Sequence, residues 1–355
     1  MSPKALPVYV ICPIGLRTGG PEALHQLVAA LRAEGVEAYL TPLYPLQEAE
    51  PVSEYESYLC GPAVPLPDGD SFHLVFAEFQ LQLGLGHLRK VVRRRNVFPW
   101  VWWLSVDNSR HPAASAYSQR MASRPSLSYS TSRSLSSNPV ISLRSKFESR
   151  KIDLRLRYLQ RHGARFLAQS VYSSRFCADE LGQSATLVTD YLREAPLADQ
   201  REVRRPTQVA FNGRKARELM EQLAPFVPEI AFTPIEGMTG IEVTKKLRRS
   251  AAYVELGPLP GRDRLPREAI RQNTPIVMLK RGAGVFFDDF PLPEIYRVAF
   301  DENWIADTSA ALRRVLAEPE RALEDQRSFL DWVLSDHVRF RSEVAKWVAE
   351  DITIA

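Results

Sequence analysis

Short apolar segments alternate with amphipathic segments along most of the chain. The segment at 100–106 is continuously apolar, which is typical of parallel strands buried on both faces. The first strand-like segment is followed by a glycine loop and a helical pattern over 21–34, in which apolar residues recur every three or four positions. The expected strands of this region lie at 6–13, 36–40, 74–77, 100–106, 166–170 and 185–188. The alternation predicts strand–helix–strand units in a parallel sheet.

A second region repeats this pattern after the charged segment 201–206, which we interpret as a linker. Its expected strands lie at 208–211, 231–235, 252–256 and 275–279. The last segment, 321–352, has a helical pattern with Trp332 and Trp347 on its apolar stripe. This region therefore predicts a second set of strand–helix units, followed by a helical C-terminal segment.

The two regions together predict an α/β protein with two Rossmann-like domains facing across a cleft. A chain of 355 residues is long enough for two domains of ordinary size. The expected boundaries are 1–200 for the N-terminal domain, 201–330 for the C-terminal domain and 331–355 for a helix that packs back toward the N-terminal domain.

Composition narrows the class of protein. With 45% hydrophobic and 25% charged residues, the chain has the profile of a globular protein and not of a disordered one. The 46 Lys and Arg against 42 Asp and Glu give a net charge of +4, so the overall charge does not favour nucleic acid as a partner. Cys12, Cys60 and Cys177 form neither a disulfide framework nor a CxxC metal pattern. Because we find no secretion signal and no membrane-spanning apolar run, we expect a cytoplasmic protein.

The segment 109–150 differs from its surroundings because it is rich in serine and, toward its end, in Arg and Lys. We interpret it as an insertion in the N-terminal domain that leads into a basic helix. The stretch Arg144–Arg165 places apolar side chains among many cations, and such a helix can lie on an anionic membrane surface. Peripheral contact with the inner membrane face and a solvated or packed helix are both compatible with this pattern.

Gly19 and Gly20 begin the first candidate motif. They precede the helix at 21–34, where the unpaired N–H groups of the first turn can hold an anion or a sugar hydroxyl close to bare backbone. Glu22 and His25 follow in the first turns of that helix and are candidates for a catalytic base. A tight strand-to-helix turn and a satisfied surface histidine are the alternative interpretations.

Asp107 and Asn108 follow the aromatic strand at 100–106. Open parallel sheets present ligand-binding side chains at the carboxyl ends of their strands, so Asp107 is a further candidate for contact with substrate. A turn closed by the aspartate side chain explains the same residues equally well.

The second domain opens with Asn212, Gly213, Arg214 and Lys215. Arginine supplies a fork for pairs of oxygen atoms, lysine supplies a mobile point charge, and the start of a helix adds its dipole. These features suit a diphosphate. A solvated helix start is the alternative interpretation.

The loop and helix start at 255–269 combine two glycines, three prolines, three arginines and three acids. This is more rigidity and charge than a connection requires, so Gly261, Arg262 and Arg264 are candidates for phosphate capture. Glu268 at the helix start can accept hydrogen bonds from ribose hydroxyls. Salt bridges around a proline-stiffened turn are the alternative interpretation.

Motifs of several enzyme classes are absent from the sequence. It has no HExxH, no G-x-S-x-G and no Walker-type glycine loop, so zinc hydrolysis, a serine α/β-hydrolase and a Walker-type ATPase lose support. The first glycine loop also lacks G-x-G-x-x-G, which gives little support to a nicotinamide cofactor.

Four motifs occur in the order T-G-G-P-E-x-L-H-Q-L, W-W-L-S-V-D-N, A-Q-S-x-Y and G-x-x-P-G-R-D-R-x-P-R-E-A. In this order the sequence resembles bacterial GT-B glycosyltransferases of the surface or capsular polysaccharide kind. The resemblance extends over nearly the whole chain. It implies that the C-terminal domain holds a nucleotide-sugar donor and that the N-terminal domain mainly holds the acceptor.

The resemblance also implies roles for single residues. Arg214 and Lys215 would contact the diphosphate, and Glu268 would hold the ribose. Many retaining enzymes of this kind carry a glutamate eight positions before the ribose glutamate, where this chain has Pro260, so the stereochemical outcome stays open. The nucleotide-sugar-binding candidates are Gly19, Gly20, Asn212, Arg214, Lys215, Gly261, Arg262, Arg264 and Glu268.

We therefore expect an enzyme that moves a sugar from a nucleotide-sugar to a glycan or lipid-linked acceptor in surface polysaccharide biosynthesis. Cationic side chains would stabilise the leaving diphosphate, and we expect no obligatory metal or other cofactor. If the reaction inverts, the base is His25, Glu22 or Asp107. A nucleotide-sugar epimerase of the same fold and a non-catalytic nucleotide- or glycan-binding protein are the alternatives.

Overall fold

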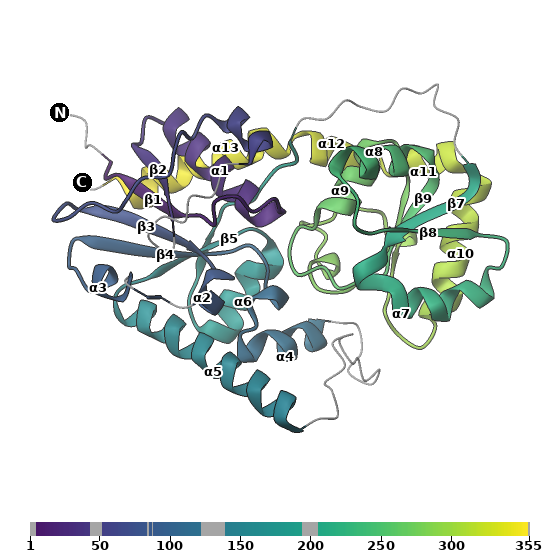
Figure 1. Ribbon diagram of the computed structural model, residues 1–355. Helices are drawn as coiled ribbons and strands as arrows, with labels where there is room; N and C mark the ends of the chain where they lie inside the picture. Colours follow the sequence, from purple (N-terminus) through teal and green to yellow (C-terminus); the bar gives the residue numbers. More distant parts are fainter. Residues whose placement is uncertain are drawn as a thin grey trace. The chain divides into compact units, whose positions relative to one another are not determined.

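The computed structural model describes residues 5–42, 52–83, 85–86, 88–121, 139–193 and 205–353 of the chain, without the side chains of 139–146 and 205–207. The chain forms two compact units (Figure 1). Unit 1 comprises Met1–Ser115, Leu143–Tyr191 and His337–Ala355, and unit 2 comprises Ala116–Ser142 and Leu192–Asp336. Residues 122–138 of the serine-rich insertion and residues 201–204 of the expected linker lie outside the described residues.

Unit 1 contains a parallel six-stranded sheet in the order β2-β1-β3-β4-β5-β6. Its strands are β1 Val8–Ile11, β2 Ala38–Thr41, β3 Phe72–Ala77, β4 Val97–Trp103, β5 Arg165–Ala168 and β6 Ala185–Leu187. The helices associated with it are α1 Gly19–Ala33, η1 Ser53–Tyr58, α2 Gln80–Leu83, α3 Leu88–Val92, η2 Asp107–Ser109, α4 Pro112–Met121, α5 Pro139–Arg161, α6 Val171–Leu181, α13 Asp336–Trp347 and η6 Val348–Ile352. Helices α1 and α13 cover one face of the sheet, and α5 and α6 cover the other (Figure 1).

The aromatic strand β4 forms the centre of the unit 1 core. Trp100 and Trp102 are almost fully buried, and the ring of Trp347 from α13 meets Trp100 edge-on at 5.2 Å. Burial of such a large apolar side chain is worth about 1.5–3 kcal/mol. The C-terminal segment is thereby held on unit 1, where Glu343 also accepts hydrogen bonds from the backbone and hydroxyl of Thr189.

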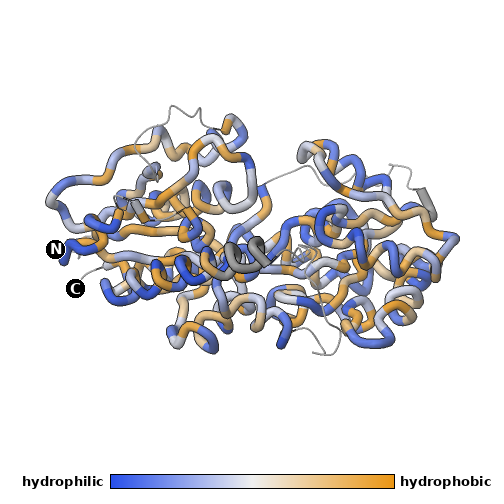
Figure 2. Tube along the Cα trace, turned by 60° about the horizontal axis from the view of Figure 1, so that its bottom comes forward, coloured by the Kyte–Doolittle hydropathy of each residue, from blue (hydrophilic) through white to orange (hydrophobic). Residues whose placement is uncertain are grey.

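Unit 2 contains a parallel five-stranded sheet in the order β11-β10-β9-β7-β8. Its strands are β7 Arg205–Asn212, β8 Ala231–Ile235, β9 Ser250–Glu255, β10 Ile276–Leu279 and β11 Arg297–Val298. Its helices are α7 Gly213–Leu223, η3 Ala224–Phe226, α8 Gly240–Arg249, α9 Arg264–Arg271, η4 Ala283–Val285, η5 Glu294–Tyr296, α10 Trp304–Ala317, α11 Pro319–Asp325 and α12 Arg327–Leu334. Helices α7 and α10 share one apolar core with the sheet. In Figure 2 apolar colour follows the strands and hydrophilic colour the outer helices.

Each expected strand is present, with ends shifted by a few residues, whereas the two-residue strand β11 was not expected. The segment 321–352 is helical, as expected, but it breaks near Gln326 and Ser335 into separate helices. The amide of Gln326 bonds both backbone groups of Ile276 at 2.9 Å, and Asp336 pairs with two arginines. These long-range polar contacts fix the ends of the shorter helices.

Candidate functional site

The candidate site of unit 2 lies where the adjacent strands β7 and β9 end. Gly213 and Gly257 follow these strands and allow the backbone there to approach neighbouring side chains closely. A Cβ at Gly257 would lie 2.5 Å from Cβ of Lys215, and a Cβ at Gly213 would lie 2.9 Å from a carboxylate oxygen of Glu236. Any larger residue at Gly257 would push Lys215 away. The backbone therefore brings the start of α7 and the loop 256–263 together.

Asn212 caps helix α7. The backbone N–H groups of Arg214 and Lys215 donate to its side-chain oxygen over 3.2 and 3.3 Å. We expected Asn212 and the start of α7 to help hold an anion, but the side chain of Asn212 already occupies these N–H groups. An asparagine in this position is a common helix cap. An anion at this end of the helix would therefore meet the cationic side chains of Arg214 and Lys215 rather than these two N–H groups.

Lys215 is the centre of a polar cluster. Its ammonium group pairs with Asp263, and its side chain is 29% exposed. Glu255 lies at the end of β9, fully buried, and accepts hydrogen bonds from the Tyr253 hydroxyl at 2.6 Å and from the Gly257 N–H at 3.0 Å. Burial raises the pKa of Glu255 to about 7, and the charge of Lys215 opposes this rise.

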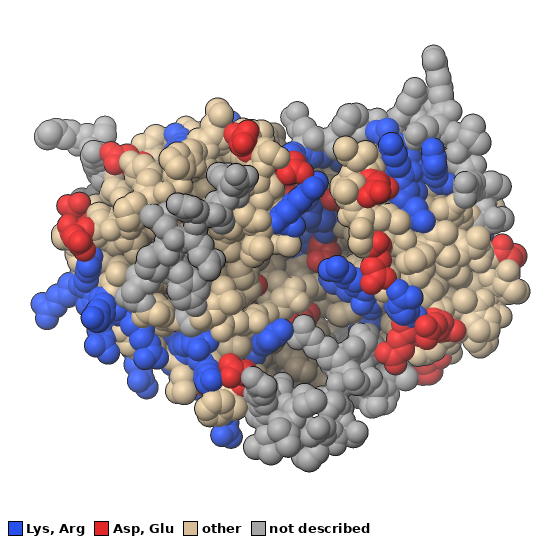
Figure 3. Space-filling model, in the orientation of Figure 1, with Lys and Arg blue, Asp and Glu red and all other residues tan. Residues whose placement is uncertain are grey.

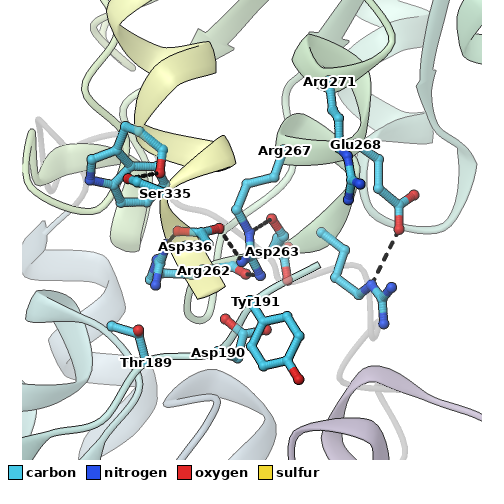
Figure 4. Close-up of polar contacts among 12 residues, drawn as sticks. Thr189, Asp190, Tyr191, Arg262, Asp263, Arg267, Glu268, Arg271, Ser335 and Asp336 are labelled. Carbon is cyan, nitrogen blue, oxygen red and sulfur yellow. Dashed lines mark hydrogen bonds and ion pairs between the residues drawn. The ribbon is translucent and has the colours of Figure 1, made fainter. Parts of the chain in front are cut away.

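Arg262 is not at the surface of its loop. Its guanidinium group is buried and pairs with Asp336 (Figure 4). It also lies 4.2 Å from the centre of the Trp332 ring. Arg267 is also buried, and it bonds Asp336 at 3.0 Å and the carbonyl oxygen of Arg262 at 2.7 Å. We expected Arg262 to face a ligand; the structure gives it the role of holding the loop. Gly261 is likewise buried within this loop.

A second glycine holds the loop from its other side. Gly282 has a φ of +57°, and a Cβ there would lie 2.1 Å from the carbonyl oxygen of Leu259. The N–H of Ala283 donates to that same oxygen over 2.7 Å. Only glycine fits this approach, so the loop 256–263 is fixed on both sides.

Arg264 and Glu268 lie one turn apart on α9 and form an ion pair at 3.2 Å. Their side chains are 30% and 29% exposed. A partly exposed pair of this kind is worth about 1 kcal/mol or less, so a ligand can replace either partner at small cost. Both side chains stay predicted ligand contacts.

In unit 1 the candidate site is built around the start of α1. Gly20 lies against the ring of Phe79, where an added Cβ would be 3.2 Å from a ring carbon. Thr18 precedes the helix, but its side chain makes no cap hydrogen bond. The Tyr55 hydroxyl donates to the carbonyl oxygen of Thr18 over 2.9 Å, so η1 holds the turn from outside the helix.

His25 lies in the second turn of α1 and is 7% exposed. Its Nδ1 lies 2.8 Å from the carbonyl oxygen of Pro21, which only accepts, so in the neutral ring Nδ1 carries the proton and Nε2 carries the lone pair. Burial lowers the pKa of His25 and favours this neutral form. The ring of Tyr55 lies 4.8 Å away. A neutral imidazole with a lone pair on Nε2 has the properties of a general base.

The two acidic base candidates differ in their surroundings. Glu22 is 2% exposed and accepts a hydrogen bond from the Tyr58 hydroxyl at 2.9 Å, so its carboxylate is committed to holding η1 against α1. Asp107 begins η2 after strand β4 and accepts a longer hydrogen bond, of 3.4 Å, from the Tyr172 hydroxyl.

Sequence reasoning missed Glu78, Arg267 and Asp336. Glu78 follows the buried strand β3, and its fully buried carboxylate accepts the N–H of Leu104 at 2.9 Å. Burial raises the pKa of Glu78 to about 8. Its position directly after a buried strand was a usable signal, whereas the partners of Asp336 lie 69 and 74 residues away and leave no local pattern.

The described ranges contain no cluster of three or more His, Cys, Asp or Glu side chains that could hold a metal ion. Within the same ranges, no helix has the length and apolar character needed to cross a membrane.

The sequence matches no protein-family profile and has no significant match among curated proteins. Solved structures with a similar fold include sucrose-phosphate synthase from Thermosynechococcus elongatus (TM-score 0.54, 12% identity, covering 97% of this chain and 99% of that one). They also include an alpha-glucosyltransferase in complex with UDP and a 13-mer DNA (TM-score 0.53, 12% identity, covering 97% and 100%). A third is WaaG, a glycosyltransferase involved in lipopolysaccharide biosynthesis (TM-score 0.52, 10% identity, covering 96% and 99%). Together with the two parallel α/β units, these similarities show that the chain has the GT-B fold, built from two Rossmann-like units.

Proposed function

We propose that this protein is a glycosyltransferase that moves a sugar from a nucleotide-sugar to a glycan or lipid-linked acceptor. The observation that carries the proposal is the cluster at the carboxyl ends of β7 and β9, where Lys215, Asp263 and the Arg264–Glu268 pair surround a loop fixed by glycines. The GT-B fold supports it, because the similar structures include glycosyltransferases, one of them with UDP bound.

The proposed chemistry is stabilisation of charge. As the bond from the sugar to the diphosphate breaks, negative charge grows on the leaving diphosphate, and Lys215, Arg214 and Arg264 provide the opposite charge. Glu268 accepts hydrogen bonds from the ribose hydroxyls. The bare backbone at Gly19 and Gly20 approaches the sugar or its phosphates. Since cationic side chains supply the charge, the proposal includes no obligatory metal.

His25 is the proposed base in an inverting reaction. Its Nε2 would take the proton of the acceptor hydroxyl as the new bond forms, and Pro21 would hold the other nitrogen in its protonated form. Asp107 stays the second candidate for this role. Either group belongs to unit 1, which the proposal assigns to the acceptor.

The polysaccharide pathway and the location are the finer parts of the proposal. The sequence motifs and the similarity to WaaG support surface polysaccharide biosynthesis. Lys and Arg gather over α3 and α5 of unit 1 (Figure 3), and Phe147 and Leu154 of α5 are 61% and 64% exposed among them. We propose that the protein lies in the cytoplasm and contacts an anionic inner membrane face through Arg144–Arg165. Flotation with acidic liposomes, compared with neutral ones and with Leu154→Ser, tests that contact.

A ligand screen followed by a turnover assay tests the function. Because a ligand that binds only the native state raises the melting temperature, a panel of nucleotide-sugars should yield one that stabilises the protein. The shift should be lost in Lys215→Ala and Glu268→Ala, and kept in Arg217→Ala, which removes an exposed arginine of the same helix α7. Free nucleotide released only when an acceptor is added supports glycosyl transfer. Formation of an epimer without free nucleotide would overturn it.

A further inference from the structure

Glu255 is the buried centre of the polar cluster in unit 2. Its carboxyl group is fully buried at the end of β9, and both of its oxygens accept a hydrogen bond. The Tyr253 hydroxyl donates to Oε2 over 2.6 Å, and the Gly257 N–H donates to Oε1 over 3.0 Å. The second bond fixes the first turn of the loop 256–263 directly above the carboxyl group.

The glycine at 257 lets Lys215 interact with this carboxyl group. A Cβ at 257 would lie 2.5 Å from Cβ of Lys215 and 3.0 Å from Oε1 of Glu255. Any residue other than glycine would therefore displace Lys215 or Glu255. The ammonium group of Lys215 pairs with Asp263 and is also attracted by Glu255. One cation therefore interacts with two carboxyl groups, one fully buried and one 25% exposed.

We propose that Glu255 is a positioning residue of the nucleotide-sugar site. It holds the Gly257 turn against Lys215, and it takes up a proton from solvent when the diphosphate replaces Asp263 as the partner of Lys215. This inference rests on the proposed function, because its ligand is the diphosphate of the nucleotide-sugar. No bond of the ligand breaks in this step; only the proton passes, from solvent to an oxygen of Glu255.

The physical reason is repulsion in a site with little water. A diphosphate beside Lys215 adds negative charge next to a desolvated carboxylate, which protonation relieves. The groups that face Glu255 are the Tyr253 hydroxyl, the Gly257 N–H, Lys215 and Asp263, and of these Asp263 raises the pKa of Glu255 while the other three lower it. Since burial already raises the pKa of Glu255 to about 7, the carboxyl group takes up this proton at a pH close to neutral.

Calorimetry with UDP-glucose measures the uptake directly, because its two phosphates have no group that titrates near neutral pH. The binding enthalpy at pH 7.5 is measured in HEPES and in Tris, and its dependence on the buffer gives the number of protons taken up. We expect roughly half a proton for the native protein. We expect none for Glu255→Gln, which keeps the size of the side chain. Tyr253→Phe, which keeps the carboxyl group, should still take up a proton. Equal uptake in Glu255→Gln and the native protein would overturn the proposal.

The pH dependence of affinity gives a second readout. Between pH 6.5 and 8.5 the affinity of the native protein for UDP-glucose should fall roughly tenfold, because the ionised carboxylate repels the diphosphate. The affinity of Glu255→Gln should stay roughly constant. A purely structural role would instead leave the affinity of the native protein independent of pH and would weaken binding in Glu255→Gln by the same factor at every pH.

A measurement without ligand separates this inference from the proposed function. Carbon-13 labelling of glutamate follows the titration of the Glu255 carboxyl group, which is assigned by its loss in Glu255→Gln. Lys215→Met should move the midpoint upward, and Arg217→Met should not. If UDP-glucose does not bind, this titration without ligand still shows whether the charge of Lys215 acts on the carboxyl group of Glu255. An unchanged midpoint in Lys215→Met would overturn it.

Discussion

Helices α1 of unit 1 and α7 of unit 2 both follow an interior strand of a parallel sheet, but they begin with different chemistry. Helix α1 starts with two glycines and without a side-chain cap, and it carries the buried, neutral His25. Helix α7 is capped by Asn212 and carries Arg214 and Lys215. One structural plan therefore offers bare backbone and a buried, neutral histidine in unit 1, and positive charge in unit 2.

A second contrast concerns the buried acids. Glu78 and Glu255 both lie at or just after the end of an interior strand and are fully buried. Glu255 is linked to the partly exposed Lys215, whereas one oxygen of Glu78 has no hydrogen-bond partner among the described residues. Burial raises the pKa of both groups, but only Glu255 adjoins a cation through which a ligand can act on it.

The largest effect is expected at His25. If its Nε2 takes the proton of the acceptor, His25→Ala should lower kcat roughly 10²–10⁴-fold, while the affinity for the nucleotide-sugar stays close to native. Initial rates and calorimetry measure the two quantities. His162→Ala, at the end of α5, is the control and should change neither. A comparable loss of kcat in Asp107→Asn, with His25→Ala near native, would move the base to Asp107.

The next effect concerns the stability of unit 1. The pKa of Glu78 is about 8 in the folded state and near its ordinary value, about 4.5, when unfolded. Between these two values the folded protein holds a proton that the unfolded chain has lost, so stability falls as the pH rises through this window. The total loss is on the order of 3–5 kcal/mol. Glu78→Gln should remove most of this dependence, giving a higher melting temperature than native at pH 8 and little change at pH 5. If the melting temperatures of the native protein and Glu78→Gln fall equally as the pH rises, Glu78 is not the source of the pH dependence.

Lys215→Ala should weaken the nucleotide-sugar roughly 10–100-fold, because it removes one charged contact with the diphosphate. The matched control Arg217→Ala should bind like the native protein. This pair sharpens the contrast between the helices, since the corresponding change at α1, His25→Ala, should leave binding intact. Equal losses in Lys215→Ala and Arg217→Ala would mean that charge on α7 acts only from a distance.

The smallest effect is expected for the cap of α7. Asn212→Ala should cost about 1 kcal/mol of stability, because two N–H groups lose their acceptor. Thr239→Ala, which removes the cap of α8, should cost a similar amount. Urea unfolding measures both, and neither should change kcat. A loss of nucleotide-sugar affinity confined to Asn212→Ala would show that Asn212 contacts the ligand, as the sequence first indicated.

Local patterns made most of the fold predictable. The strands and the glycine turns follow from hydrophobic spacing, and the ligand candidates Lys215 and Glu268 stay accessible where parallel strands end. Arg262 could not be placed, because its partner Asp336 lies 74 residues further along the chain. The burial of His25 beside Tyr55 also depends on a contact between two separate elements, α1 and η1. The sequence pattern at Asn212 also fits a helix cap, but the neighbouring cations Arg214 and Lys215 led us to predict a ligand contact instead.

Calorimetric titration of the native protein, Lys215→Ala and His25→Ala with the nucleotide-sugar that stabilises the protein tests the division of roles most directly. We expect His25→Ala to bind with native affinity and Lys215→Ala to lose most of its binding. Native affinity in Lys215→Ala, or an equal loss in both variants, would contradict it.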